Sequence, residues 1–266
     1  MDSLPFEFCD SVVSAISDLQ RFSDLVSILS PHYCKTWKAV INDHYSNRKL
    51  KEICFGKHDS TNLDDLKRIN KKHLKIRKIT WYGRNLTTSD FELLDYAKLY
   101  AHHCAIYMSD YSLIATSEEK ARFADCLKNI SFTQIYLNHP YDAVLRHQAQ
   151  SKVITRLEVR GRGWSEDVQP VIEEILLTNP IEEADICKTF VFGLAFWEKL
   201  FYVPCAKEKL FKIFIGNTRE FRDSHADLRV EKSGDHVIWK RVDGVKVSMR
   251  SSRHDTIWFE FSIGTV

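Results

Sequence analysis

Glycine and proline are scarce in this sequence of 266 residues, which contains 9 glycines and 6 prolines. Collagen-like and linker-dominated chains need many more of both. Intrinsic disorder is also excluded, because it combines few aromatic residues with high net charge. Here aromatic residues make up 12% of the chain and the formal net charge is +2. A chain of this length can bury a full core without disulfides or metals to hold it together.

Paired cysteines and long apolar runs are missing as well. The seven cysteines are widely spaced, and none forms a CxxC or CxC pair, so neither a disulfide framework nor a zinc site is predicted. No stretch approaches the ~18 apolar residues of a membrane span, and the start of the chain lacks the basic and apolar regions of a secretory signal. We therefore expect a cytoplasmic or nuclear protein that does not contact a membrane.

Motifs of the common enzyme classes are absent from the sequence. It contains no GxSxG, HExxH, GxxxxGK[ST] or GxGxxG pattern. The densest cluster of ligand-type residues is His102-His103-Cys104. Adjacent side chains on a strand point to opposite faces, so His102 and His103 are not expected to share a metal. The sequence predicts no catalytic residue, no metal site and no cofactor, and we expect a protein that is not an enzyme.

The first 45 residues carry apolar side chains at helical spacing. The first such set is Phe8, Val12, Val13, Ile16 and Leu19. Pro5 stands just ahead of it, and proline suits a helix entrance because its missing N–H costs nothing there. A second set over 22–29 and a third around Trp37 follow. Three short helices predict a small helical module.

This module resembles an F-box, a motif that opens with Leu-Pro-x-Glu, continues as an apolar helix and closes near a tryptophan. The matching residues are Leu4, Pro5, Glu7, Val12, Val13, Ile16, Leu25, Leu29 and Trp37. In F-box proteins such apolar residues dock on the Skp-type linker protein of cullin ubiquitin ligases. The resemblance therefore implies a Skp-type partner for this chain. The alternative is that the module is only a helical cap on the domain that follows.

A docking surface needs apolar side chains outside the protein's own core. We place it at Leu4, Pro5, Phe8 and Val12, because few later residues can cover the start of the chain. Val13, Ile16 and Leu25 are expected to face the interior of the module instead.

A wider resemblance covers most of the chain. Four segments are similar, in this order, to a large nematode family of F-box-like proteins: MDSLPF at 1–6, Trp37-Lys38-Ala39 with Asn47-Arg48, NKKHL at 70–74 and LLTNP at 176–180. The family implies an interaction or adaptor role and supplies no catalytic residues.

From residue 78 the chain alternates between short β-rich runs and helical segments. The markers of six expected strands are Ile79, Ile106, Ile135, Leu157, Ile186 and Ile213, at spacings of 27, 29, 22, 29 and 27 residues. One strand plus one helix per unit is the rhythm of a leucine-rich-repeat-like solenoid, in which neighbouring units stack to share one core. We expect Ile79, Ile106, Ile135 and Leu157 on neighbouring parallel strands. The alternative is an ordinary α/β or α+β domain with regular spacing.

Local signals refine this pattern. Ser89-x-x-Glu92 and Thr116-x-x-Glu119 are predicted capping boxes, in which side chains satisfy the free N–H groups of a helix start. A helix through Val168 and Leu176 is expected to stop at Asn179-Pro180. From 228 onward, apolar and polar residues alternate in four runs, which predicts an antiparallel meander that closes one end of the solenoid. Asp243-Gly244 predicts a type I′ hairpin within it.

The segment 67–78 holds seven lysines and arginines and no acid. Lys71, Lys72, Lys75 and Lys78 could contact phosphates, and Trp81 and Tyr82 could stack on bases. The alternative is that the apolar residues of the segment anchor it to the core while the lysines are solvated. Because the total charge is nearly balanced, no global field supports nucleic-acid binding.

The predicted fold class is α/β, with four parts. These are an F-box-like helical module over 1–45, a basic connecting segment over 46–77, an irregular leucine-rich-repeat-like strand–helix domain over 78–226, and a β-meander cap over 227–266. The predicted function is protein interaction, as an adaptor or substrate-recognition subunit of a cullin-type ubiquitin ligase. The alternative is a nucleic-acid-associated regulator that uses the 67–78 patch.

Overall fold

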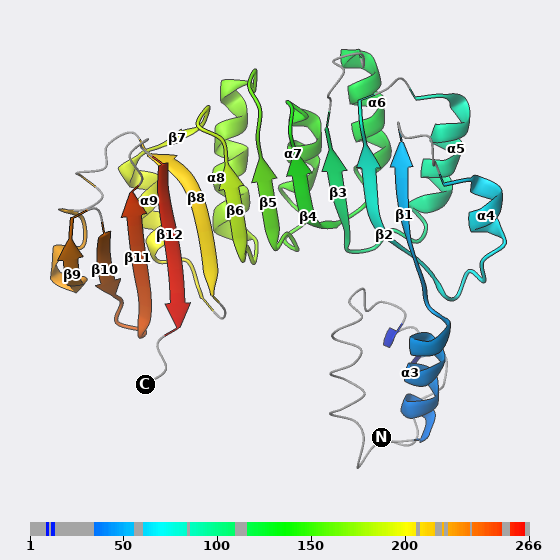
Figure 1. Cartoon of the computed structure of the whole chain (residues 1–266), viewed down its shortest axis with the longest axis horizontal. Helices are drawn as coiled ribbons and strands as arrows, with labels where there is room; N and C mark the ends of the chain where they lie inside the picture. Colours follow the sequence, from blue (N-terminus) through cyan, green and yellow to red (C-terminus); the bar gives the residue numbers. More distant parts are fainter. Residues whose placement is uncertain are drawn as a thin grey trace.

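A computed structural model describes residues 9–10, 12–13, 35–55, 61–83, 86–109, 116–205, 208–215, 220, 223–234, 236–251 and 256–263. One open, twelve-stranded sheet runs through the described part of the chain, with strand order β1-β2-β3-β4-β5-β6-β8-β12-β11-β10-β9 and with β7 paired to β8. Figure 1 shows this sheet extending along the longest dimension of the molecule. The fold class is α/β, as predicted.

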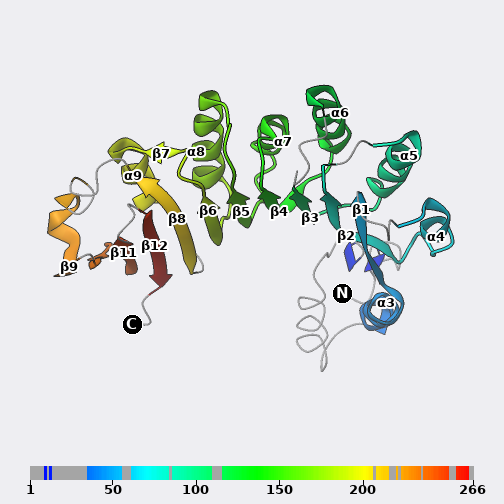
Figure 2. The same cartoon turned by 45° about the horizontal axis from the view of Figure 1, so that its top comes forward.

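The first part of the sheet is built from repeated strand–helix units. Its strands are β1 (Lys49–Phe55), β2 (Leu74–Trp81), β3 (Cys104–Met108), β4 (Phe132–Leu137), β5 (Arg156–Val159), β6 (Glu183–Ile186), β7 (Val191–Phe192) and β8 (Lys209–Ile215). The α-helices between them are α4 (Leu63–Lys67), α5 (Thr88–Ala97), α6 (Ser117–Leu127), α7 (Asp142–Gln148), α8 (Gln169–Thr178) and α9 (Leu194–Phe201); the 3₁₀ turn η1 (Glu166–Val168) leads into α8. Figure 2 shows these helices on the outer side of a curved sheet. The inner face carries no helix of the described units.

The parallel strands share a register that aligns one apolar residue of each unit. Ile79 pairs with Ile106, Ile106 with Ile135, and Ile135 with Leu157. All four side chains are fully buried. The prediction of neighbouring parallel strands is therefore confirmed, and the solenoid arrangement with it.

The register also corrects two of the markers. Leu157 pairs with Ala184, and Ala184 pairs with Phe211. These two residues lie two positions before the expected markers Ile186 and Ile213 in the sequence. Side chains two residues apart on a strand share a face, so Ile186 and Ile213 are buried on the same side. The predicted spacing between the strands was right, but the last two markers were placed two residues too late in the sequence.

The segment 46–77 is part of the repeat domain and not only a connection. It forms β1, α4 and the start of β2, and Ile53 pairs with Ile79 as the first member of the buried row. Its many charges lie on exposed positions between buried ones, such as Glu52 beside Ile53. This alternation made a half-buried strand resemble a polar linker.

The C-terminal segment forms the predicted antiparallel meander. Its strands are β9 (Arg229–Ser233), β10 (His236–Lys240), β11 (Val245–Ser251) and β12 (Thr256–Ile263), preceded by the 3₁₀ turn η2 (Ala226–Leu228). The last strand, β12, pairs with β8. The strand that follows β8 in sequence, β9, therefore lies at the far edge of the sheet, and β10, β11 and β12 lead back to β8. Phe259 of β12 pairs with Phe211 and stacks on Trp197 of α9 at 4.2 Å between ring centroids. This packing explains why the last strand, rather than the first, adjoins β8.

The predicted type I′ turn at Asp243-Gly244 needs correction. In the hairpin, Gly244 adopts a positive φ of 85° but Asp243 does not, and the N–H of Arg241 donates to the carbonyl of Val245. This is a three-residue loop with glycine in the left-handed position, and not a type I′ turn. The Asp243 carboxylate accepts hydrogen bonds from the Arg241 guanidinium and from the Val245 N–H, which stabilise this loop.

The first capping box lies two residues earlier than predicted. Helix α5 begins at Thr88, so its box is formed by Thr87 and Asp90 rather than by Ser89 and Glu92. The second box, Thr116 with Glu119, is confirmed. Helix α8 ends at Thr178 with Asn179 in an extended conformation, as the Asn-Pro signal predicted.

Near the N-terminus, helix α3 (Lys35–Asn47) leads directly into β1 and lies below the sheet in Figure 1. Residues 9–10 and 12–13 are helical. Cys9, Val13, Val40 and Ile41 form a small core that is separate from the main one, with Trp37 packed against it. The described part therefore agrees with a helical module. The predicted second helix, over 22–29, lies outside the described residues.

The buried row predicts a sharp contrast between adjacent positions of β4. Ile135→Ala should lower the free energy of unfolding by about 2–5 kcal/mol, because it leaves a cavity in the shared core. Gln134→Ala is the matched control on the opposite face, and it should cost no more than about 0.5 kcal/mol. Chemical denaturation of both variants measures the difference. Equal losses would contradict the assigned faces.

Candidate functional site

The inner face of the sheet, on which none of the described helices α4 to α9 lies (Figure 2), is the main candidate surface of the described part of the chain. Because side chains alternate along each strand, every residue next to the buried row points to this face. One such set is in register across β2 to β8: Thr80, which is itself buried, followed by Tyr107, Tyr136, Glu158, Asp185 and Lys212. A second runs from Lys78 through Ala105, Gln134, Arg156, Glu183 and Leu210 to Glu260. We call this surface the open face.

Tyrosine rings occupy the β2–β4 part of the open face. Tyr82, Tyr107 and Tyr136 lie side by side, with ring centroids 6.4 and 6.2 Å apart. Lys78 lies over the Tyr107 ring at 5.2 Å and Arg156 over the Tyr136 ring at 5.4 Å. Such cation–π contacts contribute roughly 0.5–1 kcal/mol each at exposed sites. They also hold the half-buried rings in place, which produces a preformed aromatic surface.

Hydrogen bonds fix the tyrosine hydroxyls further. The side-chain amide of Asn138 donates to the Tyr107 hydroxyl at 3.1 Å, and the Tyr136 hydroxyl donates to the side-chain amide oxygen of Gln134 at 3.1 Å. Burial raises the pKa of Tyr136 above its usual value, so its hydroxyl remains a neutral donor at physiological pH.

Ion pairs cover the next part of the open face, over β5, β6 and β8. Arg156 binds Glu183 at 2.9 Å. Arg160 bridges Glu158 and Asp185, and Asp185 also accepts from Lys212 at 3.3 Å. Exposed pairs of this kind contribute little to stability. Their main effect here is to align charged side chains from three strands in one direction.

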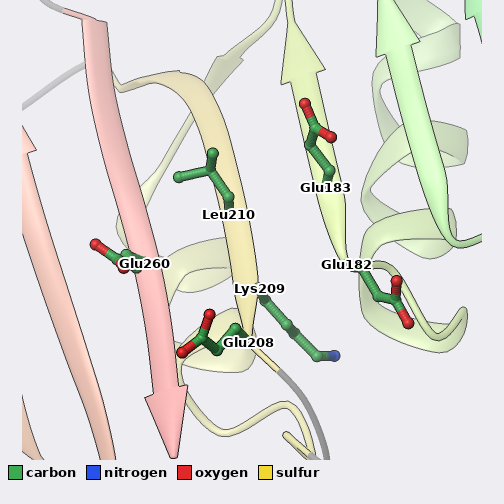
Figure 3. A pocket seen from close by; sticks show the side chains of 6 residues that line it. All are labelled: Glu182, Glu183, Glu208, Lys209, Leu210 and Glu260. Carbon is green, nitrogen blue, oxygen red and sulfur yellow. The ribbon is translucent and has the colours of Figure 1, made fainter.

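A hollow of about 310 Å³ follows at the β6–β8–β12 junction. It is lined by Glu182, Glu183, Glu208, Lys209, Leu210 and Glu260, as Figure 3 shows. Leu210 lies between Glu183 and Glu260 in the strand register. The open face thus changes along its length from aromatic and basic to acidic.

A polar joint connects the N-terminal residues to the repeat domain. The Lys72 ammonium bridges Asp10 at 2.9 Å and Asp43 at 2.8 Å. The buried His44 ring bonds the same Asp10 carboxylate at 3.0 Å, and the Arg48 guanidinium donates to the Val13 carbonyl at 2.9 Å. These contacts dock α3 and the residues around Asp10 on the turn that precedes β2.

The joint determines where the predicted phosphate-binding lysines lie. Lys72 is engaged by two carboxylates, Lys78 lies over a tyrosine ring, and burial lowers the pKa of the half-buried Lys75. Of the four candidates, Lys71 alone is exposed. The charge run therefore does not form one continuous basic surface.

The proposed stacking partner Trp81 is also not at the surface. It is completely buried and packs against Phe123 and Tyr141, so the expectation that it stacks on bases is wrong. Tyr82 does lie on the open face. Strand alternation explains the difference, because Trp81 is two residues from Ile79 and shares its buried face.

The predicted docking residues of the N-terminal module are described only in part. Val12 is 40% exposed, whereas its neighbour Val13 is 1% exposed and belongs to the small core. Both orientations are those expected. Leu4, Pro5, Phe8, Ile16 and Leu25 lie outside the described residues.

The His102–Cys104 cluster has the character of a structural segment. His103 precedes β3 with a positive φ of 55°, and burial raises the pKa of the Cys104 thiol to about 12. Within the described ranges, no group of three or more His, Cys, Asp or Glu side chains is arranged to hold a metal ion. No helix in the same ranges is long and apolar enough to cross a membrane.

Comparison with known families and with curated proteins finds no match to this chain. The class that can be stated is therefore structural: an α/β solenoid whose described repeat helices all lie on the outer face of the sheet (Figure 2), with an antiparallel β-meander at one end.

Reasoning from the sequence missed the tyrosine cluster, although a signal for it was present. Tyr107 and Tyr136 each directly follow a marker residue of the buried row, Ile106 and Ile135. Residues in that position point to the opposite face. Aligning the units on their markers would have placed both tyrosines on one surface.

The polar joint should make stability depend on pH. Burial, aided by the nearby charges of Arg48 and His73, lowers the pKa of His44 although Asp10 opposes this. The unfolded chain therefore takes up a proton below about pH 6.5 that the folded chain resists, and stability falls as the pH decreases through this range. Burial acts to raise the pKa of Asp10, but hydrogen bonds from Lys72 and His44 hold it below its usual value. Its contribution is lost only at more acidic pH, below about 4.

We expect His44→Gln to flatten the fall in unfolding free energy between pH 7 and pH 5, by up to about 1.4 kcal/mol per pH unit for one linked proton. His139→Gln, in the loop after β4, is the matched control and should keep the wild-type slope. Urea denaturation at several pH values measures both. A slope unchanged in the His44 variant would show that this ring is not the linked group.

Proposed function

We propose that this chain is a non-enzymatic recognition protein that binds a segment of a partner protein on its open face. The observation that carries the proposal is the cluster of Lys78, Tyr107, Tyr136 and Arg156 on a face that no described helix covers. Curved solenoids use such inner faces as extended binding surfaces. Tyrosine and arginine are also the residue types enriched at interface hot spots.

The fixed geometry of the cluster supports this role. Side chains that are already held by ring contacts and hydrogen bonds lose little conformational freedom when a partner binds. The adjacent ion pairs leave carboxylates and guanidinium groups at the surface, where they can discriminate between partners by charge. The nucleic-acid alternative has weaker support, because three of its four lysines are engaged or half-buried within the chain.

We further propose that the N-terminal module attaches this recognition domain to a Skp-type linker protein, so that the chain acts as an adaptor of a cullin-type ubiquitin ligase. The support is the F-box-like sequence pattern together with the exposed Val12 beside the buried Val13. The polar joint would then hold the module in a defined position relative to the open face.

The open-face proposal predicts a selective loss of binding. Tyr107→Ala with Tyr136→Ala should reduce partner recovery in quantitative affinity purification at least tenfold, because truncating a hot spot costs about 2 kcal/mol or more. The matched control is Tyr45→Ala, which removes an exposed tyrosine from α3 and should leave the open-face partner bound. Full recovery with the double variant, folded by circular dichroism, would exclude the tyrosine cluster as the binding site.

The adaptor proposal is tested with a purified Skp-type protein. Val12→Glu should weaken its binding at least tenfold, whereas the melting temperature should change little because surface substitutions usually cost no more than about 0.5 kcal/mol. Lys38→Glu, an exposed position of α3, is the control for added negative charge. If the wild-type chain does not bind the Skp-type protein, the adaptor role is excluded and the open-face proposal is unaffected.

A further inference from the structure

The acidic end of the open face holds an exposed aliphatic side chain. Leu210 is 45% exposed although it lies on β8, well inside the sheet. Its in-register neighbours are Glu183 on β6 and Glu260 on β12. An apolar side chain flanked by two carboxylates fits a ligand group that is apolar at one point and positively charged on either side.

The carboxylates around Leu210 are only partly neutralised within the chain. Glu183 is paired with Arg156. Glu208 and Glu260 have no hydrogen bond or ion pair with any residue that the structure describes, and both are exposed at the rim of the hollow. The carboxylates of Glu208 and Glu260 therefore give this rim of the hollow a negative charge. Such a surface attracts cationic partners and repels anionic ones.

Lys209 supplies an independent sign that the hollow receives a ligand. Its side chain is only 7% exposed, and it makes no hydrogen bond or ion pair within the described ranges. Figure 3 shows it extending from β8 along the wall of the hollow that contains Glu182. The Lys209 ammonium itself is not fully buried, so an oxygen atom from outside the chain can reach it and accept a hydrogen bond. A peptide carbonyl provides such an oxygen next to a side chain.

We infer that the hollow around Leu210 binds an extended peptide segment in which arginine or lysine flanks an aliphatic residue. The basic side chains would pair with Glu208 and Glu260, the aliphatic group would cover Leu210, and a backbone carbonyl would accept from Lys209. This inference rests on the proposed function, because it specifies the chemistry of the partner segment on the open face.

The probe for the test is a fluorescein-labelled peptide amide, Gly-Arg-Leu-Arg-Gly. Three matched peptides replace both arginines by citrulline, both arginines by glutamate, or the leucine by serine. Fluorescence anisotropy with the full-length protein at low salt should show saturable binding of the first peptide. Citrulline keeps the size of arginine without its charge, so that peptide should bind at least tenfold more weakly, and the glutamate peptide should not bind.

The protein variants locate the site. Glu208→Gln with Glu260→Gln, and separately Leu210→Ser, should each weaken binding of the arginine peptide about tenfold, a change equivalent to about 1.4 kcal/mol. Glu92→Gln on α5 and Leu99→Ala after α5 are exposed controls of the same types and should bind as wild type does. Thermal melting confirms that each variant is folded.

Three results would each overturn the inference. The first is that the arginine peptide shows no saturable binding below about 1 mM, a dissociation constant that corresponds to a binding free energy of about −4 kcal/mol. The second is equal binding of the citrulline peptide, and the third is unchanged binding of the arginine peptide by the protein variants. Binding of Ca²⁺ alone at the glutamates, with no peptide binding, would assign the acidic hollow to a cation instead. If the protein with Glu208→Gln and Glu260→Gln keeps its cellular partner while the protein with Tyr107→Ala and Tyr136→Ala loses it, the inference fails but the proposed function stands. If the peptide binds as expected and the tyrosine variant keeps the partner, the tyrosine cluster is excluded and the hollow is retained.

Discussion

A single row of buried apolar side chains organises this structure. It passes in register through ten strands, with one residue from each: Ile53, Ile79, Ile106, Ile135, Leu157, Ala184, Phe211, Phe259, Met249 and Val237. Each member is at most 1% exposed. A strand–helix unit cannot bury its apolar face alone, so the row forms only when the units stack. The row also crosses from parallel to antiparallel pairing, which joins the meander to the repeats as one core.

The open face is a direct consequence of the same row. A slip of one residue in any strand would exchange the two faces of that strand, so the burial of Ile106 and Ile135 also places Tyr107 and Tyr136 on the opposite side. The surface that we propose for recognition is therefore specified by the core. This relationship also explains why the acidic hollow lies at β8, where Leu210 necessarily faces away from its buried neighbour Phe211.

The N-terminal residues depend on a different kind of interaction. Their small core is joined to the sheet through charged and polar side chains, above all Lys72 with Asp10 and Asp43. These side chains are partly exposed, and their ion pairs form only when α3 and the residues around Asp10 lie against the turn before β2. They therefore favour one arrangement of α3 against the turn before β2. Under the function that we propose, this matters because the position of the attachment module relative to the recognition domain determines where a bound partner is held.

The sequence by itself determined the α/β class, the repeat period, the parallel order of the central strands, the meander and the end of α8, because these depend on local periodicity and on caps and breaks within a few residues. It misplaced the capping box at Thr87, the phase at Ala184 and the nature of the 46–77 segment, where neighbouring signals compete. Only the tertiary structure decided that Lys72 forms ion pairs with Asp10 and Asp43 and that Trp81 belongs to the core. It also decided that Tyr107, Tyr136 and Leu210 share one surface. Each of these facts depends on contacts between residues far apart in the chain, and no local pattern records them.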